Sequence, residues 1–201
     1  MFNREAKLAA VILSGGASRR MGSPKALLPY HGHSFLDHLL DVTSQPQIGA
    51  RRIVLGAHAE LITKAVRLAS QEVVINDQWE RGQLSSLHVA LRSLPQGTNG
   101  ILLCLIDHPM ISSALVCNLI DRFYSAKRPI VLPSYEGHRG HPVIFSSSLY
   151  KELLQAPLET GARAVVRAHA DEVEEVLTNE EGCVLNINDP DALQRALRQA
   201  D

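Results

Sequence analysis

Apolar residues occur along the chain in two alternating patterns, short continuous runs and segments with helical spacing. The runs lack polar alternation, which is typical of strands buried on both faces of a sheet. The segments that follow them place apolar residues three and four positions apart, as on one face of a helix. The predicted strands are 8–13, 52–56, 72–75, 101–106 and 129–133, and the predicted helices between them are 34–40, 61–69, 84–94 and 115–123.

Repeated alternation of strand and helix predicts a three-layer α/β/α fold, Rossmann-like, with a mostly parallel sheet. The pattern changes after residue 133. Residues 135–140 are rich in turn formers and 141–145 are short and extended, which predicts a small antiparallel β-hairpin as an extension of the sheet. A helix over 162–169, a strand over 173–177 and a helix over 191–199 complete the prediction. No linker or repeat interrupts this order, so we expect a single domain over residues 1–201.

Composition excludes several classes of protein. Lys and Arg number 20 and Asp and Glu number 21, a balance that argues against a nucleic-acid partner. No apolar run approaches the roughly 18 residues that cross a bilayer, and the apolar stretch near the N-terminus is too short for a signal peptide. The three cysteines are widely spaced and odd in number, which fits neither a disulfide framework nor a zinc site. We therefore expect a cytoplasmic protein with no membrane partner.

The loop after the first predicted strand has the composition of a phosphate site. Ligands of open parallel sheets bind beyond the carboxyl ends of the strands, where this loop lies. Residues 14–25 include three cations, several small residues and no acid. Glycines allow backbone N–H groups to approach anionic oxygens, and Arg and Lys add charge-assisted bonds. The spacing matches neither the P-loop nor the dinucleotide fingerprint, and a solvated glycine-rich loop is the alternative.

A carboxylate stands at the end of the most apolar predicted strand. Asp107 directly follows residues 101–106 and would therefore lie at the same edge of the sheet as the basic loop. Such a carboxylate is suited to a hard cation. The alternative, equally consistent with its position, is that Asp107 caps the helix that follows.

Six motifs in order resemble those of the MobA/MocA-type nucleotidyltransferases, which attach a nucleotide to molybdopterin. Residues 13–25 read LSGGASRRMGSPK, similar to the family signature L-[AS]-[AG]-G-x-S-x-R-M-G-x-x-K. The first motif is long and specific, and the others gain weight from their order along nearly the whole chain. These further matches are 76–87, 107–109, 139–142, 160–163 and 185–190.

The resemblance implies attack of a substrate phosphate on the α-phosphorus of a nucleoside triphosphate, with release of pyrophosphate. It also implies a fold of the nucleotide-diphospho-sugar transferase type, and Mg²⁺ as cofactor. The residues it implicates are Lys25, Arg20 and Asp107 in catalysis, Leu13, Ser14, Gly15, Gly16, Ser18, Asn76, Asp77, Gly82 and Ser86 in nucleotide binding, Arg139 and His141 in acceptor binding, and Asp107 and Asn188 in metal binding.

Departures from the family pattern leave alternatives open. Gly15-Gly16 is closer to the guanylyl branch, whereas Trp79 and residues 139–142 resemble the cytidylyl branch, which more of the chain favours. Asn188 stands where cytidylyl relatives carry an aspartate, which would weaken a metal site. We therefore favour CTP and molybdopterin as substrates. Guanylyl transfer, transfer to another acceptor such as a sugar phosphate, and a catalytically weak accessory protein that serves a molybdoenzyme or its chaperone are the alternatives.

Overall fold

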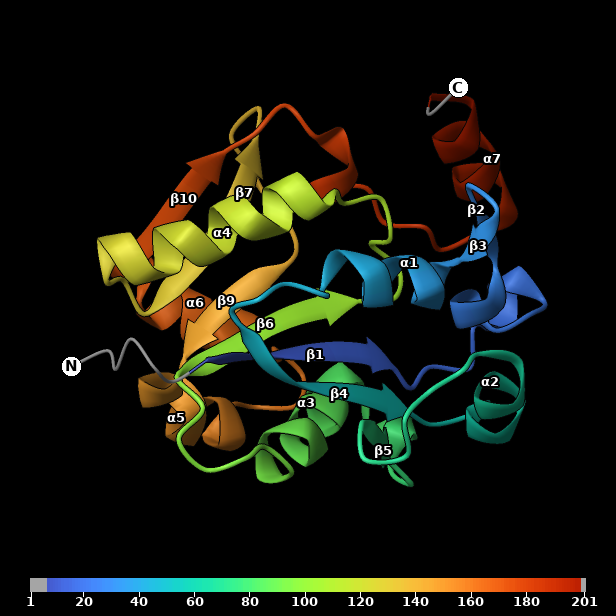
Figure 1. Cartoon of the computed structure of the whole chain (residues 1–201), viewed down its shortest axis with the longest axis horizontal. Helices are drawn as coiled ribbons and strands as arrows, with labels where there is room; N and C mark the ends of the chain where they lie inside the picture. The colour runs from blue at the N-terminus through green and yellow to red at the C-terminus, as the bar shows by residue number, and fades with distance from the viewer. Residues whose placement is uncertain (1–6, 200–201) are drawn as a thin grey trace.

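The computed structural model describes residues 7–199, and an eight-stranded sheet forms its centre. The main path of the sheet runs β10-β7-β9-β6-β1-β4-β5, and β8 pairs with β7 alone (Figure 1). Strand β1 (Leu8–Ser14) lies between β4 (Ile48–Leu55) and β6 (Gly100–Leu105) and is parallel to both. Strand β5 (Val73–Ile75) continues the parallel arrangement beyond β4. The predicted mostly parallel sheet is confirmed.

The antiparallel part of the sheet follows β7 (Ile130–Tyr135). Strand β8 (His138–Arg139) folds back onto β7 through Glu136 and Gly137, whose positive φ angles of 48° and 80° suit a tight hairpin turn. Strand β9 (Val143–Ser146) then runs antiparallel between β6 and β7, inside the sheet. Its residues are all buried, as expected of an interior strand. Strand β10 (Val173–Leu177) closes this edge, parallel to β7.

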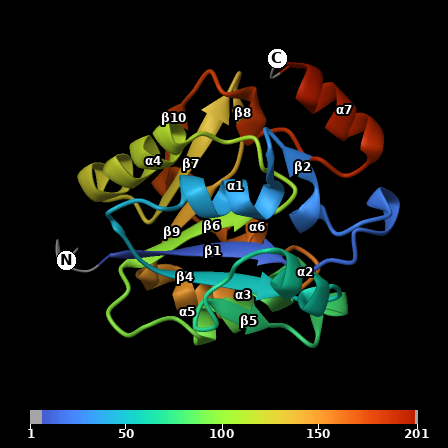
Figure 2. The same ribbon diagram turned by 45° about the vertical axis from the view of Figure 1, so that its right-hand side comes forward.

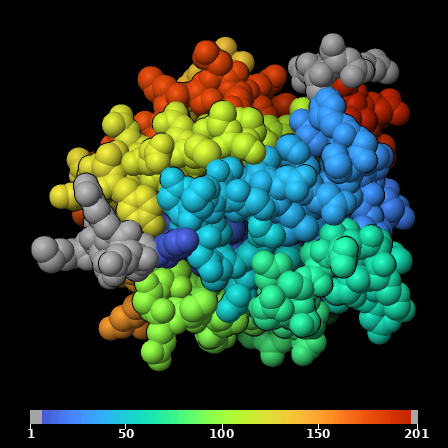
Figure 3. Space-filling view, viewed as in Figure 1, coloured from blue at the N-terminus to red at the C-terminus, as the bar shows by residue number. Residues whose placement is uncertain are grey.

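Helices cover both faces of the sheet because the strands are apolar on both sides. Along β1, Leu8 and Ile12 pack in the core that includes α1 and α4, while Ala9, Val11 and Leu13 pack in the core that includes α3, α5 and α6. Figure 2 shows the two helical layers on either side of the strands, and Figure 3 shows α1 and α4 covering one face. The helices are α1 (Phe35–Val42), α2 (Ala59–Ala65), α3 (Gln83–Arg92), α4 (Ser113–Ala126), α5 (Tyr150–Gln155), α6 (Arg163–Ala168) and α7 (Pro190–Gln199).

Several boundaries differ from the sequence prediction. Helix α2 ends at Ala65 because Val66 adopts an extended conformation, so residues predicted to be helical up to 69 lie outside it. Helix α5 was not predicted. Within residues 7–199, no helix combines the length and apolar character that crossing a membrane requires. The short elements are β2 (Pro29–Tyr30), β3 (His33–Ser34) and single-turn helices at Arg19–Met21, Lys25–Leu27, Trp79–Arg81, Ser147–Leu149, Ala170–Glu172 and Glu181–Cys183.

Candidate functional site

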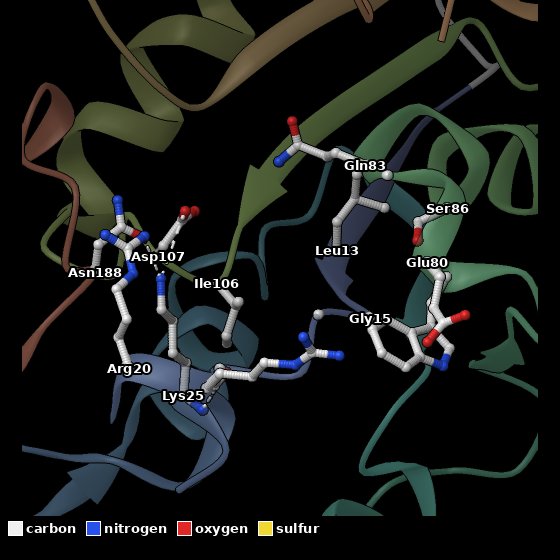
Figure 4. A pocket seen from close by; sticks show the side chains of 15 residues that line it. Leu13, Gly15, Arg20, Lys25, Glu80, Gln83, Ser86, Ile106, Asp107 and Asn188 are labelled. Carbon is white, nitrogen blue, oxygen red and sulfur yellow. Dashed lines mark hydrogen bonds and ion pairs between the residues drawn. The ribbon is translucent and has the colours of Figure 1, made fainter. Parts of the chain in front are cut away.

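A cavity of about 380 Å³ lies beyond the carboxyl ends of β1 and β6. Figure 4 shows that the cavity has two sides. One side carries the side chains of Arg20, Lys25, Asp107 and Asn188, and the other carries Glu80 and Ser86. This is the edge of the sheet at which parallel folds bind ligands. The lining residues are Leu13, Gly15, Gly16, Ser18, Arg19, Arg20, Lys25, Trp79, Glu80, Gly82, Gln83, Ser86, Ile106, Asp107 and Asn188.

The loop after β1 is closed by its own hydrogen bonds. Ser18 has a left-handed conformation with φ of 50°, and its carbonyl accepts a bond from Met21 N. Its Oγ accepts a hydrogen bond from Lys25 N at 3.2 Å. From outside the loop, the ring of His58, just before α2, donates through Nε2 to the Ala17 carbonyl at 2.9 Å. These contacts fix the backbone on which Lys25 stands and leave its side chain directed into the cavity.

Gly15 needs its lack of a side chain because this loop packs closely on α3. A Cβ at Gly15 would lie 2.9 Å from Ser86 Oγ. Ser86 is in turn held by Asn76, whose Nδ2 donates to Ser86 Oγ at 3.0 Å and to Ser85 Oγ at 2.9 Å. The wall of the cavity is therefore built from the loop after β1 and the start of α3 in direct contact.

Lys25, Asp107 and Asn188 meet at one side of the cavity (Figure 4). Lys25 Nζ donates to Asn188 Oδ1 at 2.6 Å and lies 3.7 Å from Asp107 Oδ2. Burial lowers the pKa of Lys25; the charge of Asp107 opposes this shift, and that of Arg20 adds to it. The cluster is thus a partly desolvated group of charges, the environment in which electrostatic interactions with a ligand are strongest.

Asn188 reaches this cluster because residues 180–188 cross the loop that follows β6. The Glu180 carboxylate accepts bonds from Ser112 N at 3.0 Å and from Ser112 Oγ at 2.5 Å. Further along, Ile187 N donates to the Asp107 carbonyl at 2.8 Å. The crossing segment therefore brings Asn188 next to Asp107, which is far from it in the sequence.

Three of the predicted nucleotide-binding residues do not line the cavity. Ser14 and Asn76 are buried behind its wall, and Asp77 is exposed outside it. The other six, which do line it, are Leu13, Gly15, Gly16, Ser18, Gly82 and Ser86.

The two predicted acceptor contacts also lie outside the cavity lining. The exposed Arg139 donates through Nε to Glu175 Oε1 at 2.7 Å. The ring of His141 packs on the ring of His108, with centroids 4.8 Å apart. Burial lowers the pKa of His141 to about 4; the neighbouring His108 and Arg163 contribute to the shift, and Asp107 opposes it. His141 therefore lies near Asp107 without reaching the cavity.

Five lining residues were not selected from the sequence: Arg19, Trp79, Glu80, Gln83 and Ile106. Arg19 is one of the cations of the basic loop, and Trp79 belongs to the motif over residues 76–87. Residues 79–83 follow a predicted strand and precede a predicted helix. This position predicts that they lie at the carboxyl edge of the sheet, where ligands bind, and it could have identified Trp79, Glu80 and Gln83 from the sequence.

Asp107 and Asn188 have the chemistry of ligands for a hard cation. Both present oxygen atoms to a single positive group, the Lys25 amine. Mg²⁺ prefers oxygen donors and is usually held by one or two carboxylates together with substrate phosphates and water. Within residues 7–199, no three His, Cys, Asp or Glu side chains cluster as a complete metal site. The donor set fits Mg²⁺ when water, alone or together with substrate phosphates, supplies the remaining ligands.

Comparisons with known proteins agree with this geometry. "Nicotine blue oxidoreductase" of Paenarthrobacter nicotinovorans is 30% identical over 164 residues, 78% of this chain and 80% of that protein. A "probable molybdenum cofactor guanylyltransferase" of Mycobacterium avium is 27% identical over 96% of each chain. A crystal structure of Rv0371c from Mycobacterium tuberculosis has a TM-score of 0.85 at 30% identity, covering 96% of this chain and 99% of that one; its manganese complex has a TM-score of 0.77.

A family model also matches the chain directly. It is described as the MobA-like NTP transferase domain and matches residues 10–173, which include most of β1, the basic loop and Asp107. The match covers well over half of the chain and includes every lining residue of the cavity except Asn188. The chain therefore belongs to the MobA-like NTP transferase domain family.

Proposed function

We propose that the protein transfers a nucleoside monophosphate from a nucleoside triphosphate to molybdopterin and releases pyrophosphate. The observation that carries the proposal is the convergence of Lys25, Asp107 and Asn188 at one side of a cavity that also has Glu80 and Ser86 at the other side. The family match supports nucleotidyl transfer. The name of the Mycobacterium avium relative supports the molybdenum cofactor as acceptor.

The reaction forms a bond between an oxygen of the acceptor phosphate and the α-phosphorus, and breaks the bond from that phosphorus to the β-phosphate. No covalent step on the protein is needed, so catalysis rests on positioning and on neutralising charge. Lys25 and Arg20 neutralise phosphate oxygens, with Lys25 at the α-phosphate. Backbone N–H groups of Gly15, Gly16 and Ser18 hold the triphosphate where charge develops.

Asp107 and Asn188 would hold Mg²⁺, because they present oxygen atoms side by side on the phosphate side of the cavity. A bound Mg²⁺ would add positive charge against the triphosphate. Asn188 offers an uncharged oxygen, so Asp107 carries the whole negative charge of the pair. We expect the protein to require the cation together with the nucleotide rather than to bind it tightly alone.

The donor base is proposed to bind on the side of the cavity away from Lys25. Leu13, Gly82 and Ser86 are the lining residues proposed to contact it, and Asn76 supports them through its hydrogen bond to Ser86. The motifs around Trp79 and residues 139–142 favour CTP. The guanylyltransferase name of the Mycobacterium avium relative favours GTP, so the two donors must be compared directly.

The acceptor is proposed to extend from the Asp107 side of the cavity toward Arg139 and His141. His141 is close enough to Asp107 for the charge of that carboxylate to raise its pKa, which supports an acceptor position on this side of the cavity. Delivery of the product to a molybdoenzyme or its chaperone is part of this proposal. A phosphorylated acceptor of another kind, such as a sugar phosphate, is the first alternative.

Pyrophosphate release from each of the four common triphosphates, with and without molybdopterin and Mg²⁺, tests the proposal. We expect release only when acceptor and cation are both present, and fastest with CTP or GTP. Preference for one triphosphate without turnover on molybdopterin would overturn the acceptor assignment. Binding without any turnover would favour the accessory protein. Because one relative is named "nicotine blue oxidoreductase", oxidation or reduction of nicotine blue is measured in parallel and should be absent.

A further inference from the structure

The Lys25 amine occupies the point at which the two candidate metal ligands converge. It donates to Asn188 Oδ1 at 2.6 Å and lies 3.7 Å from Asp107 Oδ2. Its side chain is only 11% exposed and that of Asp107 is 21% exposed, so solvent screens the two charges poorly. A positive charge therefore already balances Asp107 in the protein without ligands.

We propose that Lys25 is a resident counter-ion of the Asp107–Asn188 oxygen pair and that it leaves this position when a divalent cation enters. This inference rests on the proposed function, which gives the cation and the nucleotide their roles. An ammonium group and a divalent cation cannot share the same two oxygens, because their like charges repel at contact distance. Entry of the cation thus releases the Lys25 side chain into the cavity, where phosphate is proposed to bind.

The backbone around Lys25 is arranged so that only its side chain needs to move. Lys25 N remains bonded to Ser18 Oγ, and Leu28 N donates to the Lys25 carbonyl at 3.1 Å. The released amine would face the loop of Gly15, Gly16 and Ser18, which line the same cavity. Binding of the cation is then coupled to movement of the positive charge of Lys25 toward the phosphate.

The asparagine at position 188 makes this exchange feasible. Its Oδ1 accepts the Lys25 hydrogen bond but carries no net charge, so the attraction of the amine by negative charge comes mainly from Asp107, with a smaller contribution from Asp189. A carboxylate in this position would place Lys25 between two negative charges and hold it more firmly. The neutral partner therefore keeps Lys25 ordered while allowing a doubly charged ion to compete.

Mn²⁺ binding to the full chain without nucleotide tests the inference, with free Mn²⁺ followed by electron paramagnetic resonance. Lys25→Gln removes the charge and keeps a hydrogen-bond donor. Arg19→Gln removes one positive charge from the same cavity lining and has no contact with Asp107 or Asn188 among those recorded for the described residues. We expect Lys25→Gln to tighten Mn²⁺ binding at least about fivefold, and Arg19→Gln to change it less than about twofold.

A second measurement on the unsubstituted protein makes the test independent of how Lys25→Gln folds. We expect Mg²⁺ to shift or broaden the Lys25 side-chain ammonium signal in proton–nitrogen NMR spectra, and to leave the signal of the exposed Lys64 unchanged. An unaltered Lys25 signal under saturating Mg²⁺, equal effects of the two substitutions, or no Mn²⁺ binding by any of these proteins would overturn the inference. These readouts need no turnover, so they can fail while pyrophosphate release succeeds, and the reverse.

Discussion

Gly56, directly after β4, lies against the Gly15 carbonyl oxygen and the side chain of Trp79. A Cβ at Gly56 would overlap that oxygen and lie 2.7 Å from Trp79 Cβ. The next residue, Ala57, donates its N–H to the same Gly15 carbonyl at 3.1 Å. Three loops from different strands therefore meet at one point beneath the cavity, and the meeting depends on the absence of a side chain at Gly56.

We predict that Gly56→Ala lowers the free energy of unfolding by about 1–3 kcal/mol, the usual cost of forcing atoms into a packed site. Gly15 and Trp79, which the new methyl group would displace, line the cavity, so the affinity of the protein for nucleotide should fall as well. Urea unfolding and nucleotide titration measure the two effects. Gly16→Ala is the matched control for stability, since a Cβ there meets nothing within 4 Å and should change stability by less than about 0.5 kcal/mol. Equal losses in the two variants would contradict this packing argument.

Lys25→Met is expected to lower kcat/KM for pyrophosphate release at least about 100-fold, the scale of losing a charged group that stabilises a transition state. The reason is its position beside Asp107 and Asn188, inside the cavity. Initial rates at saturating Mg²⁺ provide the measurement. Lys64→Met removes a lysine that is exposed on α2 and pairs only with Glu60, at 3.9 Å, among the described contacts. Lys64→Met should retain the rate of the parent protein. A comparable loss of rate in Lys64→Met would show that the net charge of the protein, and not the position of Lys25, determines the rate.

Asn76→Ala should destabilise the protein by about 1–3 kcal/mol, because it leaves buried hydroxyl groups without their donor. Asn76 is 2% exposed and its Nδ2 bonds to Ser85 Oγ and Ser86 Oγ. Thermal and urea unfolding test this expectation. The adjacent, exposed Asp77→Asn should change stability by less than about 0.5 kcal/mol. If Asn76→Ala keeps full stability and loses only nucleotide binding, Asn76 contacts the ligand directly and the supporting role assigned to it is wrong.

Acid should destabilise the protein through His141. Burial lowers its pKa from 6.5 to about 4 in the folded state; His108 adds to the shift and Asp107 opposes it. Below pH 6.5 the unfolded chain takes up a proton that the folded protein accepts only near pH 4, so the free energy of unfolding falls as pH decreases through this window. Urea unfolding across the window measures the slope.

The variant His141→Asn removes this titrating group and should flatten the decrease in stability between pH 6.5 and about 4. The exposed His33→Asn serves as the control and should keep the slope of the parent protein. A parent-like slope in His141→Asn would show that other groups dominate acid destabilisation. A flattened slope in both variants would show that the effect is not specific to the buried imidazole.

The sequence was sufficient to predict the parallel strands β1, β4, β5, β6 and β7, because each contains a short run of apolar residues. It was not sufficient to place β9 inside the sheet, since local pattern does not specify which strands a short apolar segment joins. At the site, the spacing of Gly15, Gly16 and Lys25 located the loop. The roles of Asn76 and Asn188 could not be predicted in this way, because they depend on contacts that only the folded chain forms. Asn76 bonds to serines 9 and 10 positions away, and Asn188 bonds to Lys25, 163 positions away.

The most direct test of the proposed function uses a triphosphate labelled at its α-phosphate, incubated with molybdopterin and Mg²⁺. We predict that the label moves to the molybdopterin product in equal amount to the pyrophosphate released, and that Lys25→Met abolishes both. Label that stays in unreacted triphosphate, or appears only as free nucleoside monophosphate, would contradict transfer to molybdopterin.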